Sequence, residues 1–177
     1  MLDPAIVRAR AAAIEVLALD VDGTLTDGRI YIGPQGEVMK AFSVRDGFGL
    51  TLLREAGLKL AIITARQSAI VEQRARELGI ATVMQGVRDK RQGIEALCAE
   101  LKVAPGNVGF AGDDWTDLPA MLAVGFAATV ADASAAVRER AHWVSALPAG
   151  AGAIRELAEF ILDSRGELQA ALERRLP

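Results

Sequence analysis

The chain has 177 residues, of which 51% are hydrophobic, and this length predicts a single domain over residues 1–177 with a substantial core. Its 20 basic and 23 acidic residues give a formal net charge of −3, which provides no electrostatic basis for binding nucleic acid. The single cysteine excludes an internal disulfide, and the single histidine excludes a zinc site built from several histidines.

The first predicted element is an amphipathic helix at Pro4–Ala13. It has neither the basic start nor the apolar centre of a signal peptide. The longest apolar stretch in the chain, Ala120–Ala131, is too short to span a bilayer. We therefore expect a cytoplasmic protein that does not bind membranes.

The next element is a short buried strand at Val16–Asp20, which is followed by Asp22, Gly23 and Thr24. Side chains at i and i+2 share one face of a strand, so the carboxylates of Asp20 and Asp22 point into the same small space. Their mutual repulsion is relieved by a bound cation or a shared proton. Taken alone, the fragment also fits an Asp-rich turn after a core strand, and the downstream motifs decide between these readings.

The rest of the chain predicts a β-hairpin followed by alternating strands and helices. The hairpin covers residues 29–42, with its two strands on either side of Pro34-Gln-Gly36. Further strands are expected at Lys59–Thr64, Thr82–Gln85, Val108–Ala111, Ala127–Val130 and Trp143–Val144. Helices are expected at Asp46–Ala56, Ser68–Leu78, Lys90–Leu101, Leu118–Ala123, Ser134–Arg140, Ala153–Leu162 and Gly166–Arg174. This alternation predicts an α/β fold with a doubly wound parallel sheet and a C-terminal helical tail over residues 164–177.

Polar side chains stand where several of these strands end. Thr64 closes one apolar run, Lys90 opens the helix after another, and Asp113, Asp114 and Asp117 follow the strand at Val108–Ala111. In an open parallel sheet the carboxyl ends of the strands form the crevice in which ligands bind. We therefore expect these residues to converge with Asp20 and Asp22 on one pocket.

The chemistry of that pocket suits magnesium and phosphate. Oxygen ligands without cysteine or histidine favour a hard cation, and Mg²⁺ is commonly held by one or two carboxylates together with substrate phosphate. Lys90 and Thr64 would hold phosphoryl oxygens, assisted by backbone N–H groups around Gly23 and Thr24. Such a site can neutralise, align and attack a phosphate monoester, whose uncatalysed hydrolysis is very slow.

The order and spacing of these motifs resemble those of the haloacid dehalogenase superfamily of phosphatases. Asp20 and Asp22 match the D-x-D-G-T motif, Thr64 the second motif, Lys90 the third, and Asp113 with Asp117 the fourth. The resemblance implies that Asp20 is a nucleophile that forms an aspartyl-phosphate. Asp22 would then protonate the leaving alkoxide and later deprotonate the attacking water.

The same resemblance implies a Mg²⁺ site and excludes one branch of the superfamily. The metal would be bound by the side chains of Asp20 and Asp113 and by the main-chain carbonyl of Asp22. Asp114 and Asp117 would support the metal-bound waters and Lys90. The superfamily's dehalogenases lack the second acid and the metal, so Asp22 favours a phosphatase.

A narrower resemblance is to the 3-deoxy-manno-octulosonate 8-phosphate phosphatases of lipopolysaccharide biosynthesis. It is carried by Thr26-Asp-Gly28, Phe42-x-x-Arg-Asp-Gly47, Gln85-Gly-Val-x-Asp-Lys90 and Gly112-Asp-Asp-x-x-Asp-Leu-Pro119. It implies a sugar-acid phosphate as substrate and a homotetramer. Two positions depart from that family: Ala65 replaces the usual glycine of the second motif, and the Ala149–Ala153 loop lacks the usual arginine.

Substrate contacts and access to the site are less closely specified by the sequence. Arg45 and Arg66 lie just beyond the phosphate motifs and are candidates to hold a sugar-acid carboxylate, although each is equally explained as a solvated or structurally paired arginine. Lys40 and Arg74 are expected to be surface charges. Only the hairpin fits between the first motif and the next strand, so we expect no separate cap domain and a lid completed by a neighbouring subunit.

Two alternative functions remain open on the sequence alone. The first is the same chemistry on a nine-carbon, neuraminate-like sugar acid 9-phosphate, which the departures at Ala65 and Ala149–Ala153 allow. The second is a receiver-type regulator switched by phosphorylation, whose fold also brings acids, a threonine and a lysine to strand ends. Such regulators place the phosphoacceptor on a middle strand and have no acid two residues later.

Overall fold

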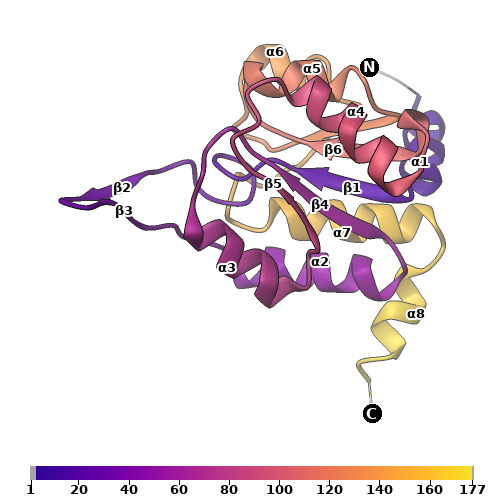
Figure 1. Cartoon of the computed structure of the whole chain (residues 1–177). Helices are drawn as coiled ribbons and strands as arrows, with labels where there is room; N and C mark the ends of the chain where they lie inside the picture. The colour runs from indigo at the N-terminus through magenta and orange to yellow at the C-terminus, as the bar shows by residue number, and fades with distance from the viewer. Residues whose placement is uncertain (1–2, 177) are drawn as a thin grey trace.

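The computed structural model describes residues 3–176 and is organised around a six-stranded parallel sheet (Figure 1). The strand order is β5-β4-β1-β6-β7-β8. The strands are β1 (Val16–Leu19), β4 (Lys59–Ile63), β5 (Thr82–Met84), β6 (Val108–Ala111), β7 (Phe126–Thr129) and β8 (Trp143–Val144). The predicted α/β doubly wound sheet is therefore confirmed.

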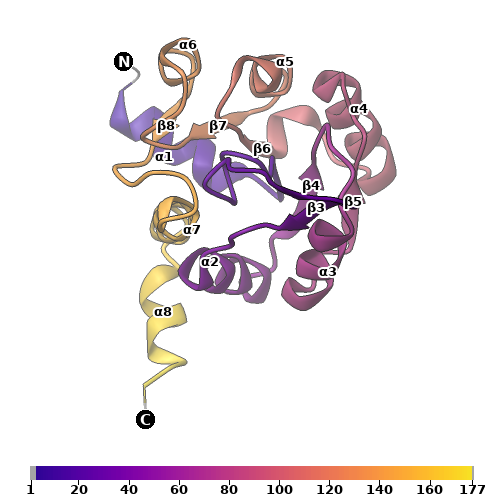
Figure 2. The same cartoon turned by 90° about the vertical axis from the view of Figure 1, so that its left-hand side faces the viewer.

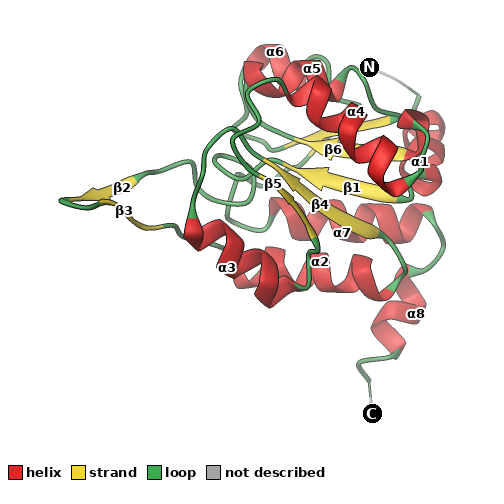
Figure 3. Ribbon diagram, in the orientation of Figure 1, coloured by secondary structure: helices red, strands yellow, loops and turns green. Residues whose placement is uncertain are grey.

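Helices cover both faces of the sheet (Figure 3). One face carries α1 (Pro4–Ala13), α2 (Val44–Glu55), α3 (Ala69–Leu78) and α7 (Ala153–Ser164), and α8 (Leu168–Glu173) continues beyond α7. The other face carries α4 (Lys90–Leu101), α5 (Leu118–Met121) and α6 (Ala135–Arg138). Short 3₁₀ turns lie at Pro105–Asn107 and Trp115–Asp117. Among the described residues, no helix is both long and apolar enough to cross a membrane.

Strand β1 is central because its sequence is apolar on both faces. Leu17 and Leu19 pack into the cluster under α2 and α7, whereas Val16 and Ala18 pack into the cluster under α4 and α5. β1 pairs in parallel with β4 on one side and β6 on the other. The residue that follows β1 therefore lies beside the ends of both neighbouring strands.

The hairpin consists of β2 (Tyr31–Gly33) and β3 (Gly36–Met39) and projects from the carboxyl edge of the sheet (Figures 1 and 2). An isolated bridge between Thr26 and Phe42 closes its base. Several large apolar side chains of the hairpin are exposed, among them Ile32 and Val38. The predicted hairpin is confirmed, with shorter strands than the sequence pattern indicated.

The remaining predicted helices and strands are present, with ends that differ by a few residues. Cys98 is buried in α4. His142 directly precedes β8. Its ring Nδ1 accepts a hydrogen bond of 2.8 Å from the backbone N–H of Ala127. Burial and the nearby Arg10 guanidinium lower the pKa of this histidine.

The N-terminus of α7 is capped from another helix, and this contact predicts a stability effect. The buried carboxylate of Asp46 in α2 accepts hydrogen bonds from the N–H groups of Gly152 (3.3 Å) and Arg155 (2.9 Å). Asp46→Ala leaves these donors unpaired and should lower the free energy of unfolding by about 2 kcal/mol in urea titrations. Asp46→Asn keeps an acceptor and should lose less. Equal losses in the two variants would contradict the capping role.

Candidate active site

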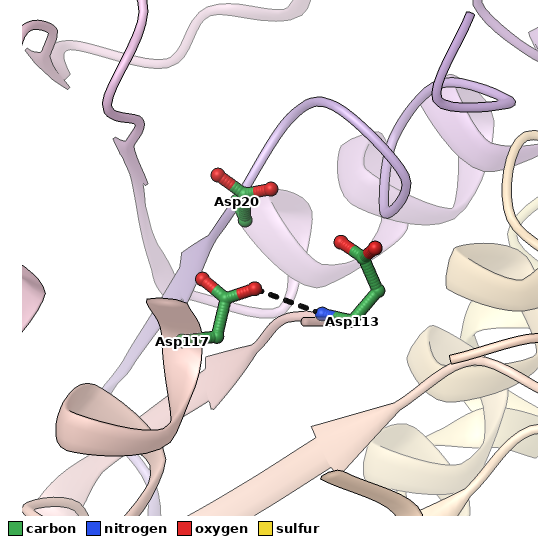
Figure 4. Close-up of side chains that lie close together, drawn as sticks. All are labelled: Asp20, Asp113 and Asp117. Atoms are coloured by element: carbon green, nitrogen blue, oxygen red, sulfur yellow. Dashed lines mark hydrogen bonds between the residues drawn. The ribbon is translucent and has the colours of Figure 1, made fainter. Parts of the chain in front are cut away.

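Three carboxylates meet at the carboxyl end of the sheet (Figure 4). Asp20 follows β1, Asp113 follows β6, and Asp117 closes the 3₁₀ turn at Trp115–Asp117. Three of their oxygen atoms, one from each carboxylate, lie within 4.8 Å of one another. The sequence prediction that these acids converge on one site agrees with this geometry.

Lys90 provides the positive charge inside this cluster. It is the first residue of α4, which Asp89 caps, and the side chain is only 2% exposed. Its Nζ donates to Oδ1 of Asp20 at 2.5 Å and to Oδ1 of Asp117. Burial lowers the pKa of Lys90, but the two carboxylates outweigh burial and raise it overall. Lys90 is therefore held as an ammonium group.

One ammonium group does not neutralise the cluster. Burial, followed by the charge of Asp117, raises the pKa of Asp20 to about 6, although Lys90 opposes the shift. Burial, together with the charges of Asp20 and Asp117, raises the pKa of Asp113 to about 7. Both carboxylates are thus destabilised in their ionised form without a further cation.

The loop after β6 is shaped by Asp117. Its Oδ2 accepts hydrogen bonds from the N–H groups of Asp113 (3.0 Å) and Asp114 (3.1 Å). A Cβ at Gly112 would collide with the Asp117 side chain, and a Cβ at Gly23 would collide with the Asp113 carboxylate. Both glycines are therefore required by close approach in the site.

The acids line a cavity of about 330 Å³. Its lining residues are Asp20, Asp22, Gly23, Gly28, Thr64, Ala65, Arg66, Lys90, Asp113, Asp114, Thr116 and Asp117. Thr24 lies behind this lining, fully buried, and donates to Oδ1 of Asp113 at 3.0 Å. A larger cavity of about 660 Å³ lies against α1 and β8, where Glu139 is the one carboxylate in the lining. The smaller cavity therefore contains the cluster of acids with Lys90 and is the candidate active site.

The donor set of the cavity fits a magnesium ion. Both oxygens of Asp117 are already engaged, Oδ1 by Lys90 and Oδ2 by two backbone N–H groups. Asp20 and Asp113 are the pair whose raised pKa values indicate unsatisfied negative charge. An oxygen-only site of this kind suits Mg²⁺, and these two side chains are placed to bind it.

Asp22 is contacted by a lysine that the sequence assigned to the surface. The side chain of Lys40 is fully buried, and its Nζ donates to Oδ1 of Asp22 and lies 3.0 Å from Oε1 of Glu37. The surface prediction for Lys40 was therefore wrong, because the hairpin folds its base back over the site. Burial acts to raise the pKa of Glu37, but the hydrogen bonds from Ser68 and Lys40 outweigh it and lower the pKa.

The two candidate substrate arginines lie in different environments. Arg66 lines the cavity, is 46% exposed, and has its Nε 3.6 Å from Oδ2 of Asp22. Arg45 is exposed at the start of α2 and lies outside the lining of this cavity. Arg74, predicted to be a surface charge, is partly buried and stacks over the ring of Phe42.

Comparisons with known proteins agree with this site. The family model of the haloacid dehalogenase-like hydrolases matches residues 37–125. The 3-deoxy-D-manno-octulosonate 8-phosphate phosphatase of Yersinia pestis is 43% identical over 92% of this chain and 87% of its own length.

A solved structure of the corresponding Moraxella catarrhalis phosphatase, in complex with a magnesium ion, a phosphate ion and a 3-deoxy-D-manno-octulosonate (KDO) molecule, is also similar. It is 36% identical, has a TM-score of 0.95, and the match covers 98% of this chain and 100% of that chain. A cobalt-bound relative from Haemophilus influenzae is 34% identical with a TM-score of 0.89, covering 91% of this chain and 94% of that chain. The chain therefore belongs to the haloacid dehalogenase-like hydrolases, in the family of the 3-deoxy-D-manno-octulosonate 8-phosphate phosphatases.

Proposed function

We propose that the protein is a Mg²⁺-dependent phosphatase that hydrolyses 3-deoxy-D-manno-octulosonate 8-phosphate to the free sugar acid and phosphate. The observation that carries the proposal is the cluster of Asp20, Asp113 and Lys90, with Asp22 two residues beyond the first acid. The match to phosphatases of this substrate over nearly the whole chain supports the choice of substrate.

Each residue of the site has a role in this reaction. A carboxylate oxygen of Asp20 attacks phosphorus and forms an aspartyl-phosphate, while Lys90 and Thr64 orient the phosphoryl oxygens. Asp22 gives its proton to the leaving alkoxide and then accepts a proton from the attacking water. Mg²⁺, held by the side chains of Asp20 and Asp113 and the carbonyl of Asp22, would neutralise charge on the phosphoryl group.

Supporting contacts come from residues around this core. Asp117 holds Lys90 and the backbone of Asp113, and Asp114 lies at the edge of the cavity where it can order metal-bound water. Backbone N–H groups near Gly23 and Thr24 are candidates to bind phosphate oxygens. Arg66 lines the cavity and is half exposed, so we assign the sugar-acid carboxylate to it rather than to Arg45.

Phosphate release from 3-deoxy-D-manno-octulosonate 8-phosphate, compared with neuraminate 9-phosphate in the presence of Mg²⁺, tests the proposal. A higher kcat/KM for the eight-carbon substrate is expected. Faster turnover of the nine-carbon substrate would keep the chemistry and assign the specificity change to Ala65 and the Ala149–Ala153 loop. A phosphorylated protein that persists for minutes without steady release of phosphate would instead indicate a receiver-type regulator.

Metal binding predicts a change in thermal stability that does not depend on activity. Mg²⁺ binds the native state and relieves the repulsion between Asp20 and Asp113, so millimolar Mg²⁺ should raise the Tm measured by differential scanning fluorimetry. EDTA should return the Tm to its metal-free value and abolish the activity. Asp113→Asn should abolish most of the Tm response, and an unchanged response in that variant would place the metal elsewhere.

A homotetramer in the cytoplasm is part of the same proposal. The hairpin leaves Ile32 and Val38 exposed at 74% and 60%, which is unfavourable for an isolated subunit. A neighbouring subunit that covers the hairpin would also shield the cavity beneath it. Analytical ultracentrifugation at micromolar concentration tests this, and a fully active monomer would refute it.

A further inference from the structure

The base of the hairpin carries a buried charge network that reaches the proposed acid–base residue. Lys40 follows β3 directly, and its side chain has no exposed surface. Its Nζ lies between Oδ1 of Asp22 and Oε1 of Glu37. Lys40 is outside the lining of the cavity, and Asp22 is the lining residue that its Nζ contacts directly.

The network is anchored at its far end. Oε2 of Glu37 accepts a hydrogen bond from the hydroxyl group of Ser68, the residue that precedes α3. Oε1 of Glu37 also lies 3.9 Å from the guanidinium group of Arg66. Glu37 thus ties the ammonium group of Lys40 to Ser68 in the β4–α3 connection, while Nζ of Lys40 donates to Oδ1 of Asp22.

The two oxygens of Asp22 consequently have different environments. Oδ1 is held by the buried ammonium group of Lys40. Oδ2 lies 3.6 Å from Nε of Arg66, a half-exposed side chain that lines the cavity with Asp22. An oxygen that already accepts from a fixed ammonium group is a poor site for a proton, whereas Oδ2 lies on the side of the cavity-lining Arg66.

We propose that Lys40 is a positioning residue that holds Oδ1 of Asp22 and thereby makes Oδ2 the oxygen that exchanges protons during the reaction. When the P–O ester bond breaks, its electron pair stays on the leaving oxygen, which takes the proton from Oδ2. When water attacks the aspartyl-phosphate, its proton passes to Oδ2, the acyl phosphate P–O bond breaks and Asp20 is regenerated as a carboxylate. The inference rests on the proposed phosphatase function.

Lys40→Met keeps the length of the side chain but removes the ammonium group. We expect kcat on 3-deoxy-D-manno-octulosonate 8-phosphate to fall about 10- to 100-fold with little change in KM, part of the contribution of general acid–base catalysis. The burst of nitrophenolate from p-nitrophenyl phosphate should fall much less, because that leaving group needs no proton. Arg29→Met, which removes an exposed cation from the same hairpin, is the matched control and should behave as the unmodified protein.

A double-mutant cycle separates positioning from a structural effect. In the Asp22→Asn background, Lys40→Met should change the steady-state rate of phosphate release from p-nitrophenyl phosphate, a step that needs Asp22 as base, by less than about twofold, since the residue through which Lys40 acts has been neutralised. An equal loss in both backgrounds, or a loss confined to KM, would overturn the proposal. If Lys40→Met does not fold, Glu37→Gln removes the anchor of Lys40 and should give the same pattern with a smaller loss.

The outcome also distinguishes this inference from the proposed function. An unmodified protein that hydrolyses p-nitrophenyl phosphate but not the eight-carbon substrate refutes the substrate, and the cycle on p-nitrophenyl phosphate then still decides the role of Lys40. An unmodified protein inactive on every phosphate ester would overturn both.

Discussion

Asp20→Asn is expected to lower the rate of phosphate release by about 10⁴-fold or more, because an amide does not replace a carboxylate as nucleophile. The fold should survive the change. Asn has nearly the same shape, and the substitution removes one negative charge from a cluster in which burial and Asp117 already raise the pKa of Asp20 to about 6. The metal-free variant should therefore have a Tm equal to or above that of the unmodified protein.

Two measurements make this prediction specific. Acid quenching during turnover should trap phosphate covalently on the unmodified protein and not on Asp20→Asn. Asp163→Asn removes a carboxylate from an exposed pair with Arg8, far from the cavity, and serves as the matched control with normal activity. Retained turnover in Asp20→Asn would remove Asp20 as nucleophile, and a large fall in Tm would show that the carboxylate is needed for folding.

The convergence of the acids could be predicted from the sequence because it depends on local pattern and sheet geometry alone. Asp20 and Asp113 each follow an apolar run, and the carboxyl ends of parallel strands meet at one edge. The pairing of β1 with both β4 and β6 then places them side by side. The prediction therefore required no long-range contact other than the pairing of the parallel strands.

The start of α2 differs from the predicted one, and Arg45 is an exposed residue of that helix. The predicted helix began at Asp46 and left Arg45 just before it. In the structure Ser43 caps the helix by accepting from the N–H of Asp46 at 3.3 Å, so α2 begins at Val44. This turns Arg45 outward and Asp46 inward onto α7. The capping serine two residues earlier was the signal that could have corrected it.

Lys40 could not have been found from local sequence. It is 18 residues from Asp22, and the contact exists because the hairpin returns its base to the first motif. A lysine directly after an exposed strand is most simply read as a solvated charge. The burial of Lys40 depends on the tertiary path of the chain, which neither periodicity nor motif spacing encodes.

Lys90→Met should destabilise the metal-free protein strongly at neutral pH. The substitution leaves Asp20 and Asp117, both buried, without the ammonium group that pairs with them. Breaking a buried ion pair from one side typically costs about 3–5 kcal/mol of unfolding free energy, and we expect a loss of this order in urea titrations at pH 7.5. Arg91→Met is the control. It removes an exposed ion pair with Glu95 one residue further along α4 and should have little effect on the free energy of unfolding.

The pH dependence separates this electrostatic loss from a loss of packing. The pKa of Asp20, already raised to about 6 in the folded protein although Lys90 opposes the shift, should rise further without Lys90. A folded-state pKa above the unfolded value gives a contribution to stability that is present at low pH and lost as the pH rises through the folded-state pKa. The Tm deficit of Lys90→Met should therefore be small near pH 5 and large near pH 8.

The Tm of Lys90→Met with and without Mg²⁺ tests the same electrostatic explanation. A divalent cation on Asp20 and Asp113 stabilises the same carboxylates that Lys90 serves, so Mg²⁺ should recover part of the lost Tm at pH 8 and little at pH 5, where the acids are protonated. Turnover should stay low, because the metal does not replace the ammonium group that orients the phosphoryl oxygens. A Tm deficit that is equal at both pH values and insensitive to Mg²⁺ would mean that Lys90 stabilises the fold through packing, and the charge balance of the cluster would need another explanation.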